Sequence, residues 1–154
     1  MINLRRDWPT IILVAAMFAA AMWTWPIAPA KIPSHWNASG QVDGYSGRFA
    51  GLMLMPIIGA ATYLLTGLGP LLRPAKFDAR LARALRFESF AVILLLAGVM
   101  VVTIAAIHGR VVNMNSVVWP LLVVVFAASG NLVFRAAQSK LAQMNLPAGG
   151  GAKR

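Results

Sequence analysis

The chain has 154 residues, of which 59% are hydrophobic and 12% are charged, and it contains no cysteine. A water-soluble domain of this size could not bury so much apolar surface, so the composition excludes an ordinary soluble globular protein. Disulfides and thiol chemistry are excluded too. The formal net charge of +10 would suggest nucleic-acid binding in a soluble protein, but in a membrane protein the positions of the cations matter more than their sum.

Four apolar runs follow one another along the chain, each about 20 residues long, which is enough to cross a hydrocarbon core of about 30 Å. They predict membrane spans at roughly 8–28, 49–68, 87–107 and 117–134. Asp7 and Pro9 suit a helix cap and a first turn at the start of the first span, and Pro56 is expected to kink the second span. The predicted fold is an all-α integral membrane protein with a single four-helix domain, 1–146, and a disordered tail, 147–154.

All but three of the fourteen lysines and arginines lie before the first span, between the second and third spans, or after the fourth. Because positively charged segments remain in the cytoplasm, we expect a multi-pass protein of the bacterial inner membrane with both termini cytoplasmic. The loop 31–48 would then face outward. A cleavable secretory signal is the alternative interpretation of the first span, since Arg5, Arg6, an apolar stretch and the segment 28–30 follow its pattern.

Residues 73–88 are predicted to form a basic amphipathic connector on the inner side. Its basic arc is expected to contact anionic lipid headgroups or to dock a soluble acidic partner. Nothing beyond the charge supports nucleic-acid binding. The arc consists of Lys76, Arg80, Arg83 and Arg86.

The spans carry few polar residues, and no Asp, Glu, Lys, Arg or His lies in the middle of a predicted span. This pattern argues against a proton pump or an intramembrane metalloprotease. Glu88, at the entrance to the third span, is expected to pair with Arg135 at the same depth of the fourth. Asn131 is expected to hydrogen-bond between helices, and small residues such as Gly47 and Gly51 to permit close helix packing.

The loop 31–48 is rich in glycine, proline and aromatic residues, which predicts a compact folded cap instead of a slack tether. Asp43 could pair with Arg48 across a turn. His35 with Asp43 could instead hold the cap together, contact a ligand or toxin, or act in catalysis. Two such groups are too few for a metal or catalytic site, so no metal, cofactor or catalytic residue is predicted.

The same loop resembles a known family. It runs Ile32-Pro-Ser-His-Trp-Asn-Ala-Ser-Gly-Gln-Val-Asp-Gly-Tyr-Ser-Gly-Arg48 and is followed by an apolar run containing Pro56. This string is similar to the bacterial domain of unknown function 1648, the N-terminal part of SdpI-type immunity membrane proteins. The match covers roughly the first 60 residues. The matching positions, which are also the candidate recognition or structural residues, are Pro33, His35, Trp36, Asn37, Gly40, Asp43, Tyr45 and Arg48.

Farther along, Gly130-Asn131 resembles the start of the C-terminal signature of SdpI-type proteins, but the chain departs from that signature afterwards. The resemblance therefore implies a short member lacking most of that half. It also implies a role in protection against a secreted toxin, or in holding a repressor at the membrane.

Two functions are predicted on these grounds. The leading one is a non-enzymatic SdpI-like membrane protein whose outer loop recognises a peptide toxin or another ligand. The alternative is a small accessory or structural subunit of a larger membrane protein complex. The expected partners are anionic lipids, a membrane protein complex or a second copy of the chain, and a peptide toxin.

Overall fold

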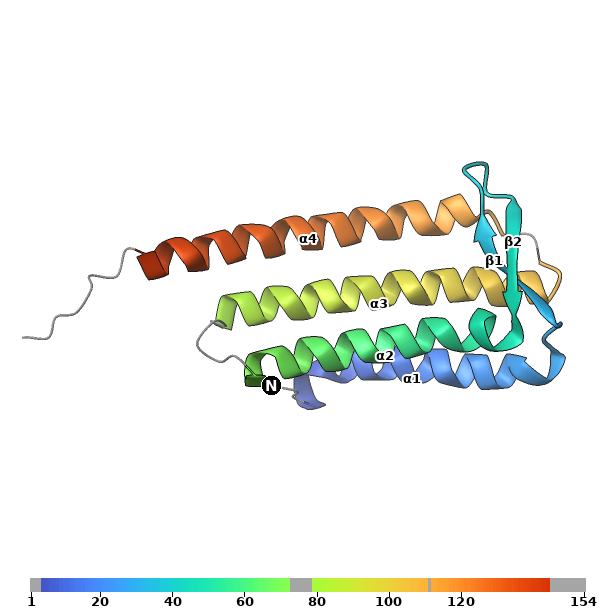
Figure 1. The fold of residues 1–154 in the computed structure, drawn as a ribbon, viewed down its shortest axis with the longest axis horizontal. Coiled ribbons are helices and arrows are strands. Elements are labelled where there is room, and N and C mark those ends of the chain that lie inside the picture. Colours follow the sequence, from blue (N-terminus) through green and yellow to red (C-terminus); the bar gives the residue numbers. More distant parts are fainter. Residues whose placement is uncertain (1–3, 73–78, 111, 145–154) are drawn as a thin grey trace, which may run out of the picture.

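The computed structural model describes residues 4–72, 79–110 and 112–144. Four long helices lie side by side, and a β-hairpin crosses one end of the bundle (Figure 1). The elements in chain order are α1 (Leu4–Thr24), a short 3-10 turn (Trp25–Ile27), β1 (Lys31–Trp36), β2 (Val42–Gly47), α2 (Arg48–Leu72), α3 (Ala79–Ile107) and α4 (Met114–Met144).

Each predicted span falls on one of these helices, and all four are long and apolar enough to cross a membrane. The boundaries differ in detail. α1 begins before Asp7, so this residue lies inside the first turn and does not cap the helix. α2 runs through Pro70 to Leu72, past its predicted end. α3 begins at Ala79 and already includes the second half of the predicted connector, so the basic segment and the third span form one continuous helix.

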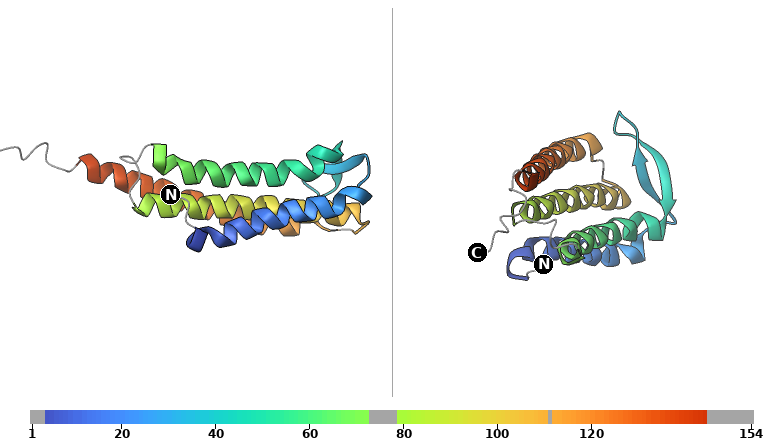
Figure 2. Two further views of the ribbon diagram at one scale, coloured as in Figure 1. Left: turned by 90° about the horizontal axis from the view of Figure 1, so that it is seen from below. Right: turned by 60° about the vertical axis from the view of Figure 1, so that its left-hand side comes forward.

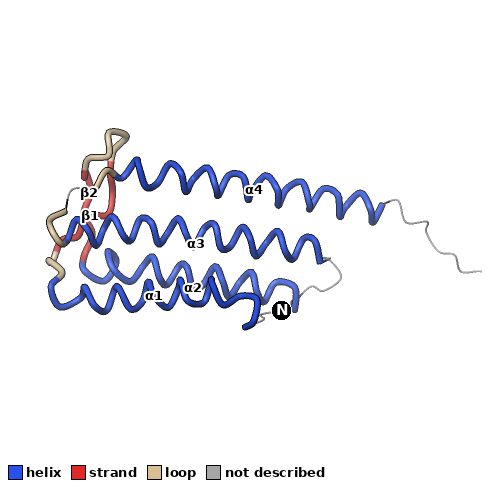
Figure 3. Tube along the Cα trace, turned by 180° about the vertical axis from the view of Figure 1, so that it is seen from behind, coloured by secondary structure: helices blue, strands red, loops and turns tan. Residues whose placement is uncertain are grey.

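The fold is not entirely helical, because the loop between α1 and α2 contains two antiparallel β-strands. The end of the bundle that carries them is called the hairpin end, and the turn between α3 and α4 lies there as well (Figure 3). The other end, where α2 ends and α3 begins, is called the connector end. α1 also begins at the connector end.

α3 occupies the centre of the bundle, since it contacts each of the other three helices, whereas α4 packs mainly on α3 (Figure 2). Gly98 permits the close approach of α4, because a Cβ atom on this glycine would lie only 2.4 Å from a methyl carbon of Leu121. The outward faces carry large apolar side chains such as Trp23, Leu65 and Phe126, each more than two-thirds exposed. Such faces are those expected of helices surrounded by lipid.

The core lies toward the hairpin end and includes Met17, Leu52 and Ile93. Ile32 of β1 is fully buried in it. Gly51 makes room for this side chain, since a Cβ atom there would lie 2.8 Å from Ile32. Gly51 therefore serves the contact between the hairpin and α2, not the helix–helix contact predicted for it. At Gly47, no atom of the described residues beyond its chain neighbours lies within 4 Å of such a Cβ position.

Candidate functional site

The hairpin turn is built around Asn37. Its side-chain oxygen accepts hydrogen bonds from the backbone amides of Ser39 and Gln41, both at 3.0 Å. The amide of Gly40 donates to the carbonyl of Asn37 at 2.8 Å. Gly40 has a φ of 76°, a left-handed conformation that favours glycine. Two of the candidate loop residues, Asn37 and Gly40, thus shape the turn itself.

His35 and Asp43 face each other across the two strands, with Nδ1 of the imidazole 2.5 Å from Oδ1 of the carboxylate. Both side chains are accessible, at 72% and 43% exposure. Gly44, which is opposite His35 in the strand register, allows this arrangement, because a Cβ atom there would lie 2.7 Å from Cβ of His35. Asp43 pairs with His35, and the described residues show no ion pair between Asp43 and Arg48.

Two grooves flank β1 at the hairpin end. The first, of about 360 Å³, lies between β1 and the start of α4, and its lining includes His35, Trp36 and Trp119. The second, of about 520 Å³, lies between the hairpin and the end of α3, and its lining includes Pro33, Trp36 and Arg110. Trp36 therefore lines both grooves.

The start of α4 supports the hairpin in a way that the sequence reading missed. The side-chain amide of Asn115 donates to the carbonyl of Ala38 at 3.0 Å. Asn113 accepts from the backbone amide of Asn115 at 3.0 Å, as expected at a helix N-terminus. The closely spaced polar residues at 113–116 were the available signal, since such side chains favour helix caps.

The remaining loop residues take peripheral positions. Tyr45 lies opposite Pro33 in the strand register and is 61% exposed. Arg48 is half-buried at the first position of α2. Neither side chain lines the two grooves.

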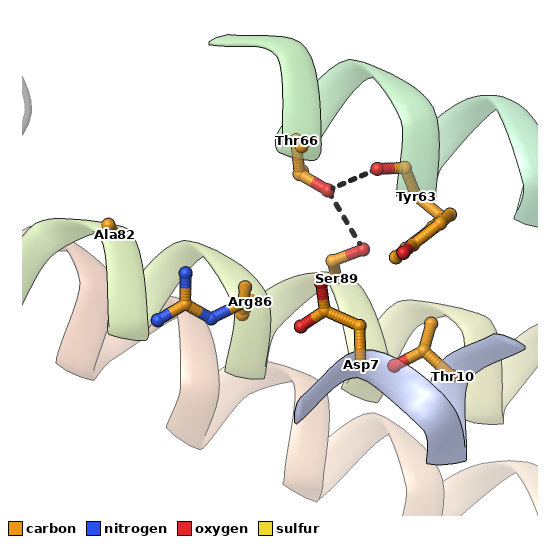
Figure 4. Close-up of a pocket in the computed structure, with 8 residues that line it drawn as sticks. Asp7, Thr10, Tyr63, Thr66, Ala82, Arg86 and Ser89 are labelled. Atoms are coloured by element: carbon orange, nitrogen blue, oxygen red, sulfur yellow. Dashed lines mark hydrogen bonds between the residues drawn. The ribbon is translucent and has the colours of Figure 1, made fainter. Parts of the chain in front are cut away.

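A polar cavity of about 20 Å³ lies between α1, α2 and α3 at the connector end (Figure 4). Asp7 is only 6% exposed, and in this view its carboxylate lies between Arg86 and Tyr63. The Thr66 hydroxyl lies 3.2 Å from the Ser89 hydroxyl, joining α2 to α3. The cavity has room for about one water molecule, so it is too small for a substrate. Its polar side chains come from α1, α2 and α3 and connect these helices.

The basic arc predicted for the connector is divided between two places. Arg86 lines the polar cavity with Asp7. Arg80 and Arg83 instead face α4 across a groove of about 280 Å³, here called the basic groove. Lys76 lies outside the described residues. The basic groove is lined by Arg80, Arg83, Ala84, Phe87, Asn131 and Arg135.

Glu88 has a different partner from the one predicted. Its Oε1 accepts a hydrogen bond of 2.7 Å from the Ser129 hydroxyl of α4, and no ion pair with Arg135 occurs in the part of the chain that the structure describes. Arg135 lines the basic groove instead. Asn131 is exposed in that groove, so the interhelical hydrogen bond predicted for it is not observed among the described residues.

Among the described residues, four helices are long and apolar enough to span a membrane, which indicates a multi-pass membrane protein. The family model described as Domain of unknown function (DUF1648) matches residues 12–60, which confirms the resemblance found in the sequence. The matched segment runs from within α1, through the hairpin, into α2. Searches of curated proteins and of solved structures found no match.

Proposed function

We propose that this protein is a non-enzymatic receptor of the bacterial inner membrane whose hairpin end binds an extracytoplasmic peptide, in the manner expected of SdpI-type immunity proteins. The observation that carries the proposal is the groove between β1 and α4. It places the accessible side chain of His35 beside the aromatic surfaces of Trp36 and Trp119. Both termini are cytoplasmic in this proposal, because most lysines and arginines among the described residues lie toward the connector end.

The lining of the groove suggests the chemistry of the ligand. Trp119 is 62% exposed, and Met114, Val118 and Leu122 extend the apolar surface along α4. His35, which pairs with Asp43, adds a polar group to the lining. Binding sites commonly combine apolar walls with a few fixed polar groups, and this combination suits an apolar peptide segment that also carries polar groups, such as a membrane-active peptide toxin.

The experiment compares cells that express variants and are exposed to a secreted peptide toxin of the kind against which SdpI-type proteins protect. We expect the native chain to increase survival, and His35→Ala and Trp119→Ala to reduce that protection. Trp23→Ala is the matched control, because Trp23 is 82% exposed and lines neither groove. Equal survival of all variants, at equal protein levels in the membrane, would remove the groove from any protective role.

The second candidate function is that of an accessory subunit, which is favoured by the packing of α4. This helix packs mainly on α3, and its other faces expose large side chains such as Phe126 and Val133. Gly130 is exposed, and no side chain of the described residues lies within 4 Å of a Cβ position there, so another helix could approach closely. Purification in mild detergent separates the two functions, since a subunit would elute in a stoichiometric complex and a receptor as a small particle or homo-oligomer.

A further inference from the structure

The basic groove is formed by one face of each of two helices. Arg80, Arg83 and Phe87 follow the spacing that places residues on one side of α3. Asn131 and Arg135 are four residues apart and share one side of α4. All five line the same space, so the groove depends on the packing of α3 against α4 and not on a single helix end.

Among the described residues, three guanidinium groups line the groove and no carboxylate does. In the described part of the chain, none of the three forms an ion pair, and the nearby Glu88 is hydrogen-bonded to Ser129. Guanidinium groups remain charged at any physiological pH. Because like charges around one groove repel each other, an anion bound among them would stabilise the arrangement.

The groove also changes polarity along its length. Arg80 lies in the first turn of α3, and Phe87 follows seven residues later, about 10 Å farther along the helix axis toward the centre of the span. Phe87 is 51% exposed, while Ala84 between them is buried. The groove is therefore cationic near the end of the bundle and gains one large apolar side chain, Phe87, on its bilayer side, which follows the order of polarity within a phospholipid.

We propose that the basic groove is a specific binding site for an anionic phospholipid, with the lipid phosphate held by Arg80, Arg83 and Arg135 and an acyl chain lying along Phe87. A guanidinium group presents paired N–H donors that match two phosphate oxygens. The side-chain amide of Asn131 adds a further donor. Basic pockets between membrane helices are suited to lipid headgroups in general, and here the apolar extension favours a lipid over free phosphate.

The test uses the full chain, purified in mild detergent and incubated with phosphatidylglycerol or with phosphatidylcholine of the same acyl chains. Lipid retained per protein is measured by native mass spectrometry. We expect phosphatidylglycerol to be retained about tenfold more strongly, because both lipids carry the phosphate but the choline cation of phosphatidylcholine is repelled by the three guanidinium groups. Equal retention of the two lipids would overturn the proposal.

Variants then locate the site. Arg135→Gln should reduce phosphatidylglycerol retention to nearly that of phosphatidylcholine, and Arg135→Lys should have an intermediate effect because it keeps the charge but loses the paired donors. Lys140→Gln is the matched control, with the same change of charge on an exposed position of α4 outside the groove. An equal loss for Lys140→Gln would show that total charge, not the groove, binds the lipid. If circular dichroism shows that Arg135→Gln misfolds, Arg80→Gln replaces it, since Arg80 is exposed.

A competition with inorganic phosphate distinguishes the two sources of a phosphate group. We expect lipid retention to persist, because inorganic phosphate cannot make the contact with Phe87. Displacement of the lipid by equimolar inorganic phosphate would show a simple anion site and would overturn the assignment to a phospholipid.

Discussion

The side-chain amide of Asn115 and the carbonyl of Ala38 form a hydrogen bond of 3.0 Å that joins the first turn of α4 to the tip of the hairpin. The two residues are 77 positions apart. Because α4 otherwise packs mainly on α3, this bond links the two walls of the groove between β1 and α4. The shape of the proposed peptide site therefore depends on it.

Replacement of Asn115 by alanine should loosen the hairpin tip. One hydrogen bond contributes about 1 kcal/mol, or about a fivefold change in the equilibrium for local opening. Hydrogen exchange of the peptide that covers 37–41 should be faster by that factor in detergent micelles. Asn131→Ala, at the other end of the bundle, is the control and should leave this exchange unchanged. An unaltered rate in Asn115→Ala would show that the hairpin holds its position without α4.

The turn itself should depend on the side-chain oxygen of Asn37. Asn37→Ala removes the acceptor of two backbone amides, and we expect a loss of about 1–2 kcal/mol of local stability. Asn37→Asp is the matched variant, because a carboxylate keeps the acceptor. Protease cleavage within 37–41 should accelerate in Asn37→Ala only. Equal cleavage in both variants would mean that the backbone bonds alone maintain the turn.

The contact between Gly51 and Ile32 provides a test of the hairpin's attachment to the bundle. A methyl group on Gly51 would lie 2.8 Å from Cβ of Ile32, so Gly51→Ala should lower the free energy of unfolding by about 1–3 kcal/mol, as overpacking does. Gly59→Ala is the matched control in the same helix. Its new methyl would meet only ordinary contacts at 3.8 Å or more, so this variant should be neutral or more stable.

The free energies of unfolding of Gly51→Ala and Gly59→Ala can be measured by unfolding in a denaturing detergent, followed by circular dichroism. Ile32→Gly removes both the Cβ and the γ-methyl carbon that the new methyl would meet at 2.8 Å, so a double-mutant cycle of Gly51→Ala with Ile32→Gly should show a favourable coupling energy. Equal stability of Gly51→Ala and Gly59→Ala would contradict the close approach of the hairpin to α2.

The four helices could be predicted from the sequence because lipid imposes a simple requirement. A span must be long, apolar and internally hydrogen-bonded, and the apolar runs meet that requirement without reference to any partner. The hairpin was harder to predict from the sequence. The segments 31–36 and 42–47 flank the turn residues Asn37 and Gly40, which is a recognisable hairpin signal, but glycine and proline obscured the alternation expected of strands.

The polar contacts could not be predicted because they depend on helix rotation and on helix neighbours. The depth of a residue in the membrane follows from its position along the span, so the sequence predicts Arg135 as a partner for Glu88. The rotation of α4 instead brings Ser129 to Glu88 and turns Arg135 toward Arg80 and Arg83. Asp7 is a similar case, since an earlier start of α1 places it in the interior among three helices and not at a cap.

Double-mutant cycles would show directly whether Glu88 interacts with Ser129 or with Arg135. Glu88→Ala and Ser129→Ala should show a coupling energy of about 1–2 kcal/mol, as for a hydrogen bond to a carboxylate. Glu88→Ala and Arg135→Ala should be additive within about 0.5 kcal/mol. Both cycles are obtained by measuring the free energy of unfolding of each single and double variant in mixed micelles. A larger coupling for the arginine pair than for the serine pair would restore the ion pair predicted from the sequence.

The orientation in the membrane can be tested with single cysteines, because the native chain has none and gives no background. Ser39→Cys places a thiol on the exposed hairpin turn, and Gln138→Cys places one on an exposed position of α4 toward the connector end. Since cations are retained in the cytoplasm, a membrane-impermeant maleimide should label Ser39→Cys in intact cells and Gln138→Cys only after permeabilisation. The reverse pattern would place the hairpin in the cytoplasm, where it could not meet a secreted toxin, and the proposed receptor function would fail with it.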